Sequence, residues 1–175
     1  MQLNYLFALH EIQSFLVFLY VGLNLFKSLR IKPWLTWRLP LLWTLHLSAY
    51  MIICGFLLLG LYELALFSNK SLSVHAITVG GIGLMSLSMM TRVSLGHTGR
   101  PIQADTLITL SLLLCIFAFI FRVILSVFFE RSYDAILTIS AICWGLAFLF
   151  YFIGFSSKLF QKRHYEFVLP IKKKA

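Results

Sequence analysis

Three histidines and two arginines are the residues of this sequence whose type and placement could support chemistry. His46 and His75 lie within long apolar runs, and His97 lies in a short basic stretch together with Arg92 and Arg100. An imidazole can bind a metal, carry a proton or donate a hydrogen bond to a neighbouring helix, and all three roles are open here. Guanidinium groups can bind a phosphate or a carboxylate. The sequence therefore raises the question of a metal site or an anion site.

The basic stretch reads MMTRVSLGHTGRPI, residues 89–102, and combines its cations with glycine. Gly96 and Gly99 predict a sharp turn, and Pro101 is expected to begin the next helix. We expect exposed N–H groups of this turn to form an anion cradle beside the two arginines. A haem propionate, a phosphate and a lipid headgroup all fit such a cradle. A basic loop that only anchors the chain fits equally well.

The composition excludes an ordinary soluble domain. Of the 175 residues, 60% are hydrophobic and only 12% are charged, whereas soluble domains average about 45–50% and about 25%. The start, MQLNYLFALHEIQSF, has neither a basic region nor a small-residue cleavage site, so no signal peptide is expected. The chain is therefore predicted to be a membrane protein. Its net charge of +9 is expected to hold it near anionic lipid, with no nucleic acid as a partner.

Five apolar runs are long enough to cross a bilayer as helices, since a span needs about 20 apolar residues. The breaks between them carry proline, glycine or charge. The predicted fold class is all-α, a polytopic membrane helix bundle that forms a single transmembrane domain over residues 1–175 and ends in a basic cytoplasmic tail at 158–175. The predicted spans are 5–27, 40–62, 71–92, 104–128 and 135–157.

Lysine and arginine concentrate in every second connection between these runs. The first and third connections and the C-terminal tail hold most of the cations, and the second and fourth connections are poor in them. Cytoplasmic loops of membrane proteins are enriched in lysine and arginine. We therefore predict that the N-terminus lies outside and the C-terminus in the cytoplasm.

The predicted depths of two histidines argue against one shared haem. His46 lies about 9 Å inside the second span from its cytoplasmic end, and His75 lies about 6 Å below the outer surface in the third. In a hydrocarbon core about 30 Å thick, these positions are about 15 Å apart along the membrane normal. His46 could instead join His97, and His75 could meet His10 or another chain. Each ring could equally be bonded to a neighbouring helix or to water.

Two charged residues belong to the fourth span. Arg122 is expected to snorkel toward the outer surface, in preference to a pairing with Glu130 near the interface. Asp105 is placed to stabilise the N-terminus of the helix that follows it.

Small residues inside the spans are expected to serve packing. A strip of small side chains in the third span predicts the close approach of another helix, and it consists of Ala76, Gly80 and Gly83. The cysteines lie in apolar runs and are expected to be buried and unpaired, and they are Cys54, Cys115 and Cys143. Their spacing does not match a ligand set, so a copper thiolate site is the less favoured interpretation.

The segment VHAITVGGIGLMSLSMMTRVSLGHTGRPI resembles the C-terminal half of the NnrS family, membrane proteins that contain haem and copper and are linked to nitric oxide stress. The segment PLLWTLHLSAYMIICGFLLLG, residues 40–60, is also similar to a segment of that family. FRVIL and CWGLAFLFYF follow in the expected order. The resemblance covers residues 34–155, most of the chain.

This resemblance implies that His46, His75 and His97 bind haem or copper, and that Arg92 and Arg100 hold an anionic group such as a propionate. It also implies a multi-pass protein of the bacterial inner (cytoplasmic) membrane. Members of the family are usually much longer, and their front half carries a signature rich in tryptophan and histidine that does not occur here. Besides the lipid bilayer and haem, the expected partner is therefore a second copy in a homo-oligomer or a separate front-half NnrS-like protein.

The resemblance thus implies a haem-binding membrane protein that contributes to the response to nitric oxide stress, with copper as a second candidate metal. The alternatives are a cofactor-free truncated relative with a structural or assembly role, and a haem electron-transfer subunit. No carboxylate pair, nucleophile triad or phosphate loop occurs in the sequence, so a hydrolase or NTPase has no support. Whether the chain is an enzyme is left open.

Overall fold

The computed structural model describes the backbone of residues 2–36 and 38–160, and the side chains of residues 10–36, 38–129, 131–156 and 158. Every regular element in this part of the chain is helical, which confirms the predicted all-α fold class. In chain order the elements are α1 (Gln2–Arg30), η1 (Pro33–Thr36), α2 (Pro40–Glu63), α3 (Lys70–His75), η2 (Ala76–Gly83), α4 (Leu84–His97), α5 (Thr106–Phe119), η3 (Ile120–Leu125), α6 (Ser126–Phe128), η4 (Glu130–Ser132) and α7 (Tyr133–Phe160), where η marks a short 3-10 or π-helical segment.

Five helical rods among the described residues are long and apolar enough to cross a membrane. The third rod joins α3, η2 and α4 as Lys70–His97, and the fourth joins α5, η3 and α6 as Thr106–Phe128. The other rods are His10–Arg30, Pro40–Glu63 and Tyr133–Ser156. Each predicted span coincides with one rod, so the five-span architecture is confirmed. The third rod continues beyond the predicted end at residue 92, because the stretch expected to be a loop is helical as far as His97.

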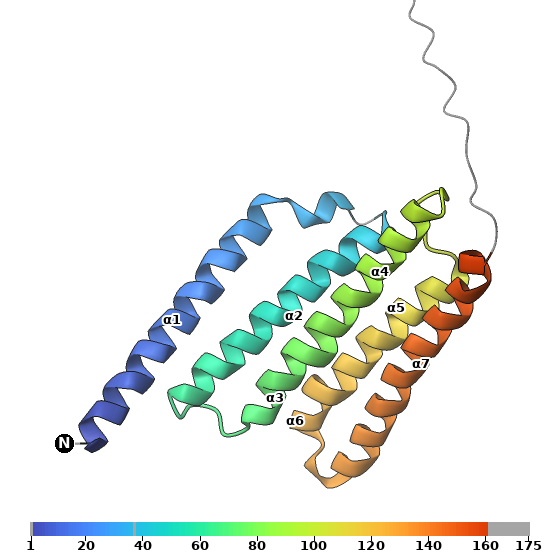
Figure 1. Cartoon of the computed structure of the whole chain (residues 1–175). Helices are drawn as coiled ribbons and strands as arrows, with labels where there is room; N and C mark the ends of the chain where they lie inside the picture. Colours follow the sequence, from blue (N-terminus) through green and yellow to red (C-terminus); the bar gives the residue numbers. More distant parts are fainter. Residues whose placement is uncertain (1, 37, 161–175) are drawn as a thin grey trace, which may run out of the picture.

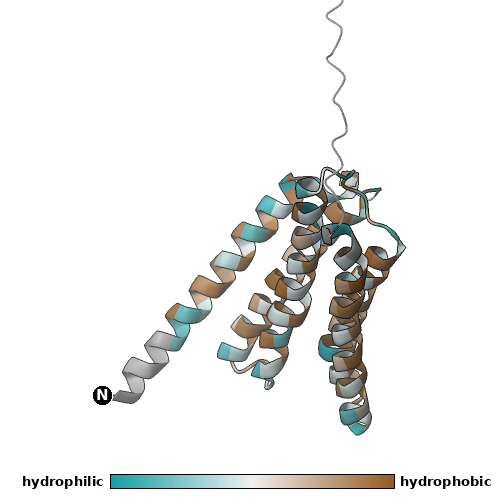
Figure 2. Ribbon diagram, turned by 45° about the vertical axis from the view of Figure 1, so that its right-hand side comes forward, coloured by the Kyte–Doolittle hydropathy of each residue, from teal (hydrophilic) through white to brown (hydrophobic). Residues whose placement is uncertain are grey.

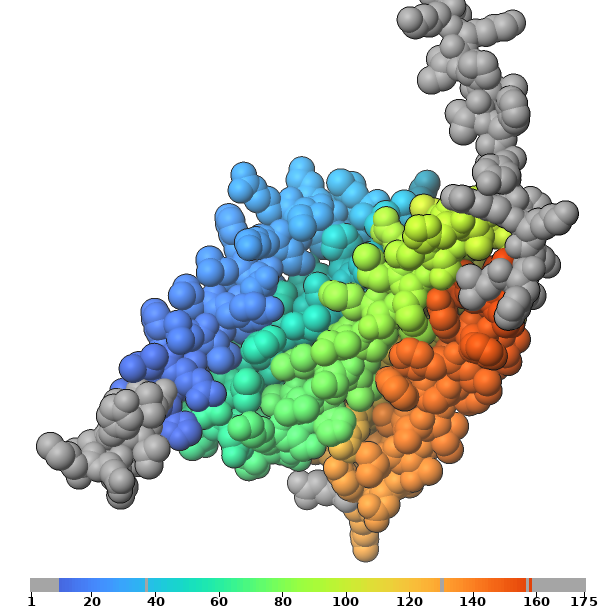
Figure 3. Space-filling model, viewed as in Figure 1, coloured from blue at the N-terminus to red at the C-terminus, as the bar shows by residue number. Residues whose placement is uncertain are grey.

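The rods follow one another across the bundle in chain order, with α1 at one edge and α7 near the other (Figure 1). The ribbon of α1 diverges from the other rods toward its N-terminus (Figure 2). Side chains nevertheless bring α1 against α2, as the space-filling view shows (Figure 3), and the ring centroids of Tyr20 and Phe56 are 4.6 Å apart.

Most cationic side chains of the described chain lie at one end of the bundle, where α1, α4 and α7 end and α2 and α5 begin (Figure 1). This end is called the basic end below, and it is defined by Lys27, Arg30, Lys32, Arg38, Arg92, Arg100 and Lys158. The opposite end carries Glu63, Lys70, Arg131 and Asp134. Two of these four side chains are acidic, so the excess of positive charge belongs to the basic end.

The buried core lies between the third rod, α5 and α7, and its fully buried residues include Leu84, Leu87, Ile108, Cys115 and Ala147. Hydroxyl groups connect the rods. The Thr44 and Ser88 hydroxyls are 2.8 Å apart between α2 and α4, and Ser111 donates to the Ala147 carbonyl oxygen at 2.6 Å. Because lipid is as apolar as a leucine side chain, such contacts take the place of hydrophobic burial in holding membrane helices together.

Glycines of the third rod allow α2 and α5 to approach it closely. A Cβ atom on Gly80 would lie 2.3 Å from Cδ2 of Phe119, and a Cβ atom on Gly81 would lie 2.2 Å from Cγ1 of Ile52. The predicted close approach at the strip of small residues is therefore confirmed. The three cysteines all have free thiols, as predicted, although only Cys115 is fully buried.

Candidate functional site

His46 lies in the second turn of α2 and faces a cavity of about 280 Å³ near the basic end. The lining comes from α1, α2, α4 and the residue that follows α1, and it consists of Tyr20, Asn24, Lys27, Ser28, Ile31, His46, Ala49, Ile52, Ile53 and Met85. His46, Ala49 and Ile53 share this face because they are spaced at three and four residues along one helix. The His46 ring makes no hydrogen bond or ion pair with any other described residue. Its nitrogen atoms are therefore open to a group in the cavity.

His75 differs from His46 because protein groups occupy both of its ring nitrogens. Nδ1 lies 2.6 Å from the carbonyl oxygen of Ser71, and Nε2 lies 3.1 Å from Nη2 of Arg122. A carbonyl oxygen can only accept and a guanidinium can only donate, so Nδ1 carries the proton and Nε2 accepts. The ring is thus held in the neutral Nδ1–H tautomer. This geometry corresponds to the bonded alternative that the sequence left open for each histidine.

Arg122 contacts the third rod and the first residue of α7, and its snorkelling toward the outer surface stays a prediction. Besides His75, it donates to the hydroxyl of Tyr133 at 3.2 Å. The two acceptors offer the guanidinium polar contacts at membrane depth, where a cation without them would be costly. Arg122 and His75 both lie at π-helical segments, since η2 begins directly after His75 and η3 contains Arg122. Short π-helical segments within helices occur frequently at functional sites.

The glycine turn is the C-terminal cap of α4, which makes the predicted anion cradle wrong. The N–H of Arg100 donates to the carbonyl of Leu95 at 3.0 Å, and the N–H of Gly99 donates to the carbonyl of Gly96 at 3.2 Å. Gly99 has a φ of 68°, as this type of cap requires. Its N–H groups are therefore used within the cap, and the nearby carbonyls give the helix end a partial negative charge. Such an end does not attract an anion.

His97 is the last residue of α4, so it does not belong to a loop. Its side chain is exposed. Helix α5 begins only at Thr106, capped by Asp105, which accepts from the N–H of Ile108 at 2.9 Å. The predicted role of Asp105 is confirmed. The expectation that Pro101 begins this helix is wrong, because residues 101–105 form a connection outside it.

Arg92 lies with Arg38 at a second cavity, of about 460 Å³, at the start of α2. The remaining lining residues are Leu39, Pro40, Leu41, Leu42, Ile102, Gln103 and Ala104. Arg100 is not among them. The predicted contact of Arg92 and Arg100 with a cofactor carboxylate stays a prediction, and the structure gives Arg92 a different cationic neighbour.

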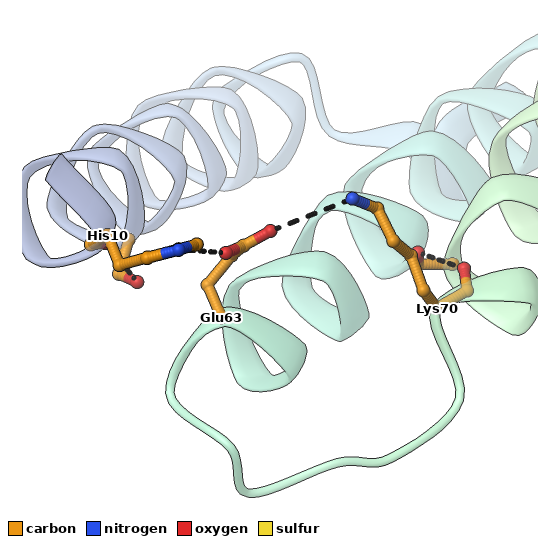
Figure 4. Close-up of polar contacts among 5 residues, drawn as sticks. His10, Glu63 and Lys70 are labelled. Carbon is orange, nitrogen blue, oxygen red and sulfur yellow. Dashed lines mark hydrogen bonds and ion pairs between the residues drawn. The ribbon is translucent and has the colours of Figure 1, made fainter. Parts of the chain in front are cut away.

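His10 contacts Glu63 of α2, so the alternative in which it meets His75 is wrong. Nδ1 of His10 lies 2.7 Å from Oε2 of Glu63, and Nζ of Lys70 lies 4.0 Å from Oε1 of the same carboxylate (Figure 4). The Glu63 side chain is only 4% exposed. The contact therefore connects α1 to the end of α2 and the start of α3, and it becomes an ion pair when the His10 ring is protonated.

The three predicted histidine ligands do not converge on one metal. Met85, which shares the cavity of His46, is ten residues from His75 and twelve from His97 along the third rod, or about 15 and 18 Å at 1.5 Å per residue. Among the described side chains, no three His, Cys, Asp or Glu residues form a group that could hold a metal ion. The described residues therefore offer single imidazoles and no complete ligand set.

The sequence model of the family described as "NnrS protein" matches residues 2–163, nearly the whole chain. The chain belongs to the NnrS family. Comparison with curated proteins and with solved structures gave no match. Membership of this family of membrane proteins agrees with the five apolar rods, and it extends the resemblance found in residues 34–155 to both ends of the described NnrS chain.

Sequence reasoning missed three residues that the structure places at these sites. Arg38, Lys27 and Tyr133 were treated only as loop cations or not considered. A signal for Arg38 existed, since Arg38 stands two residues before Pro40 and a cation so close to a proline that begins a helix lies near the positive end of that helix. The contact of Tyr133 with Arg122 gave no such signal, because it depends on how α7 packs against η3.

Proposed function

We propose that this NnrS-family chain binds haem through His46 and contributes to the response of the membrane to nitric oxide. The supporting observation is the His46 ring, which faces a cavity and makes no internal hydrogen bond among the described residues. Family membership supports the choice of haem as the ligand. When bound, haem would supply a redox-active iron that can take up a small gas.

The residues around His46 fit one side of a haem. Tyr20, Ile52, Ile53 and Met85 supply apolar surface, while Lys27 and Asn24 lie toward the basic end and could meet a carboxylate. The cavity volume of about 280 Å³ is slightly below the range of about 300–1,000 Å³ for ligand pockets. A haem on His46 would therefore extend beyond the cavity. A second copy or a separate front-half protein would cover the exposed part and complete the haem site.

Copper has less support in this chain. Protein copper sites such as the blue-copper centres combine three or more histidine and sulfur ligands, and no group of three His, Cys, Asp or Glu residues that could hold a metal occurs among the described residues. We therefore assign no copper ligand to this chain.

We further infer that the basic end faces the cytoplasm of a bacterial inner membrane, because cytoplasmic ends of spans carry an excess of lysine and arginine. In this orientation His46 lies in the cytoplasmic half of the bilayer and His75 in the outer half. The orientation can be tested by modifying single cysteines in intact cells with a membrane-impermeant thiol reagent. Cysteine placed at Ser68 should react from outside, whereas cysteine placed at Gln103 should not.

A cofactor-free structural role is the second candidate function. It is favoured by His75 and His10, whose rings are both occupied by protein partners. Purification of the full chain after expression with ample haem distinguishes the two candidate functions. The haem proposal predicts a Soret band that shifts when nitric oxide is added. A folded but colourless protein would support the structural role.

A further inference from the structure

The cavity at the start of α2 brings together two arginines that have no acidic partner among the described residues. Arg38 lies two residues before Pro40, and Arg92 projects from α4 on the other side of the cavity. The ion pairs of the described chain involve other side chains, namely His10, Lys70 and Lys158. Two guanidinium groups at one cavity repel each other unless an anion lies between them, and guanidinium binds phosphate with two parallel hydrogen bonds.

The backbone around this cavity adds to the positive potential. Leu39 precedes the first turn of the 24-residue helix α2 and provides no side-chain cap, so the positive end of the helix dipole faces the cavity. The cavity also contains the side chain of Gln103, whose amide can donate a hydrogen bond. Asp105, the acid nearest to it in the sequence, is engaged with Lys158.

The remaining lining residues are apolar, so we expect the ligand to carry apolar groups as well as a negative charge. Leu39, Leu42 and Ile102 line the same cavity as the arginines, and Leu39 and Ile102 are more than half exposed. A free phosphate ion would make no favourable contact with this apolar surface. A phospholipid would place its phosphate between the arginines and its glycerol and upper acyl chains against the three aliphatic side chains.

We propose that the Arg38–Arg92 cavity binds the phosphate of an anionic phospholipid headgroup. The cavity lies at the basic end, at the level where the rods begin and end, and this is the depth of lipid headgroups. Basic pockets between transmembrane helices on the cytoplasmic side bind anionic lipid in this way. The proposal requires no haem, because Lys27, and not Arg92, lines the cavity of His46.

The test uses the full chain in nanodiscs that contain equal amounts of phosphatidylglycerol and phosphatidylcholine, followed by native mass spectrometry of the lipid that remains bound. We expect the wild-type chain to retain phosphatidylglycerol preferentially. The Arg92→Gln and Arg38→Gln variants should each lower this preference by about tenfold, since one charge-assisted hydrogen bond corresponds to a factor of this order. Arg92→Lys should retain part of it, and circular dichroism should show that all variants remain helical.

Arg30→Gln is the matched control, because Arg30 lies at the same end on an exposed position of α1 and does not line the cavity. It should leave the preference unchanged. An equal loss in Arg30→Gln, or no loss in the two cavity variants, would overturn the proposal in favour of diffuse surface attraction. Displacement of the lipid by millimolar inorganic phosphate, or by loading the chain with haem, would also overturn it and assign the cavity to free phosphate or to a cofactor carboxylate.

Discussion

Nη2 of Arg122 lies 3.1 Å from Nε2 of His75, so a guanidinium at membrane depth occupies the ring nitrogen through which this histidine could bind a metal. The other ring nitrogen is bonded to the Ser71 carbonyl. Metal-bound histidines often have this second contact, because it fixes the tautomer and directs Nε2 toward the metal. Here the guanidinium takes the position of the metal. His75 is therefore better explained as a partner of Arg122 than as a haem ligand.

The Tyr133 hydroxyl should stabilise the fold through its contact with Arg122. Tyr133→Phe removes one of the two side-chain acceptors of Arg122, and we expect it to lower the free energy of unfolding by about 1–3 kcal/mol. Unfolding by sodium dodecyl sulfate in mixed micelles measures this free energy. Tyr50→Phe is the control, since its hydroxyl makes no hydrogen bond with the described residues, and it should change stability by less than about 0.5 kcal/mol. Equal effects of the two changes would contradict the role of Tyr133.

Two glycines of the basic stretch should respond to alanine with opposite signs. Gly99 has a φ of 68°, so Gly99→Ala should destabilise the fold by about 1 kcal/mol. Gly96 lies within α4, and no heavy atom lies within 4 Å of an added Cβ. Gly96→Ala should therefore stabilise the fold by about 0.5–1 kcal/mol. A stabilising effect of Gly99→Ala in the same unfolding assay would show that the turn is not the helix cap described here.

Close packing of the third rod against α5 predicts a strong response at Gly80. An added Cβ would lie 2.3 Å from Cδ2 of Phe119, whose side chain is nearly buried. Gly80→Ala should therefore destabilise the fold by about 1–3 kcal/mol, because the ring has little room to move. Gly145→Ala in α7 meets no atom within 4 Å and should be neutral or slightly stabilising. Thermal unfolding of the two variants side by side distinguishes them, and a harmless Gly80→Ala would contradict the close approach.

The contact between Asp105 and Lys158 should make stability depend on acid pH. Partial burial raises the pKa of Asp105, but the hydrogen bonds from Lys158 and Ile108 and the charge of Lys158 outweigh it, so the pKa lies below its ordinary value of 3.8. A carboxylate with a lowered pKa contributes stability above the unfolded pKa, and the contribution is lost as the pH falls through the folded pKa. The wild-type chain should therefore lose more stability below about pH 4 than Asp105→Asn does.

Asparagine is a suitable replacement at this position because it also caps helices well, so only the charge changes. Unfolding midpoints of both chains at neutral and acid pH give the comparison. Parallel pH profiles for the two chains would show that the ionised carboxylate of Asp105 does not cause the loss of stability at acid pH.

The five rods could be predicted from the sequence because length and apolar composition alone define a membrane span. The ends of the rods were less certain. MMTRVSLGHTGRPI contains glycine, proline and cations, which are signals of a turn, but the helix continues through Gly96 to His97 and the turn comes only at Thr98 and Gly99. Glycine is tolerated inside a helix, and the sequence does not show which of two nearby glycines adopts a positive φ.

The sites could be predicted only in part. The residue types of His46 and Arg92 were recognised, and the separation of His46 from His75 followed from helix geometry. The neighbours of His75 and Arg92 could not be recognised, because Arg122 contacts His75, and Arg38 shares a cavity with Arg92, across segments distant in sequence. Local spacing cannot predict such contacts. For the same reason Arg92 was paired with its sequence neighbour Arg100.

The visible spectrum of haem-loaded single variants tests the central claim most directly. If His46 is the residue through which this chain holds haem, His46→Ala should lose the Soret band or shift it, while His75→Ala and His97→Ala should keep the wild-type spectrum. Circular dichroism should confirm that all three variants remain helical. A wild-type spectrum in His46→Ala, together with loss of the band in His75→Ala, would contradict the account and would require Arg122 to move away from His75 when haem binds.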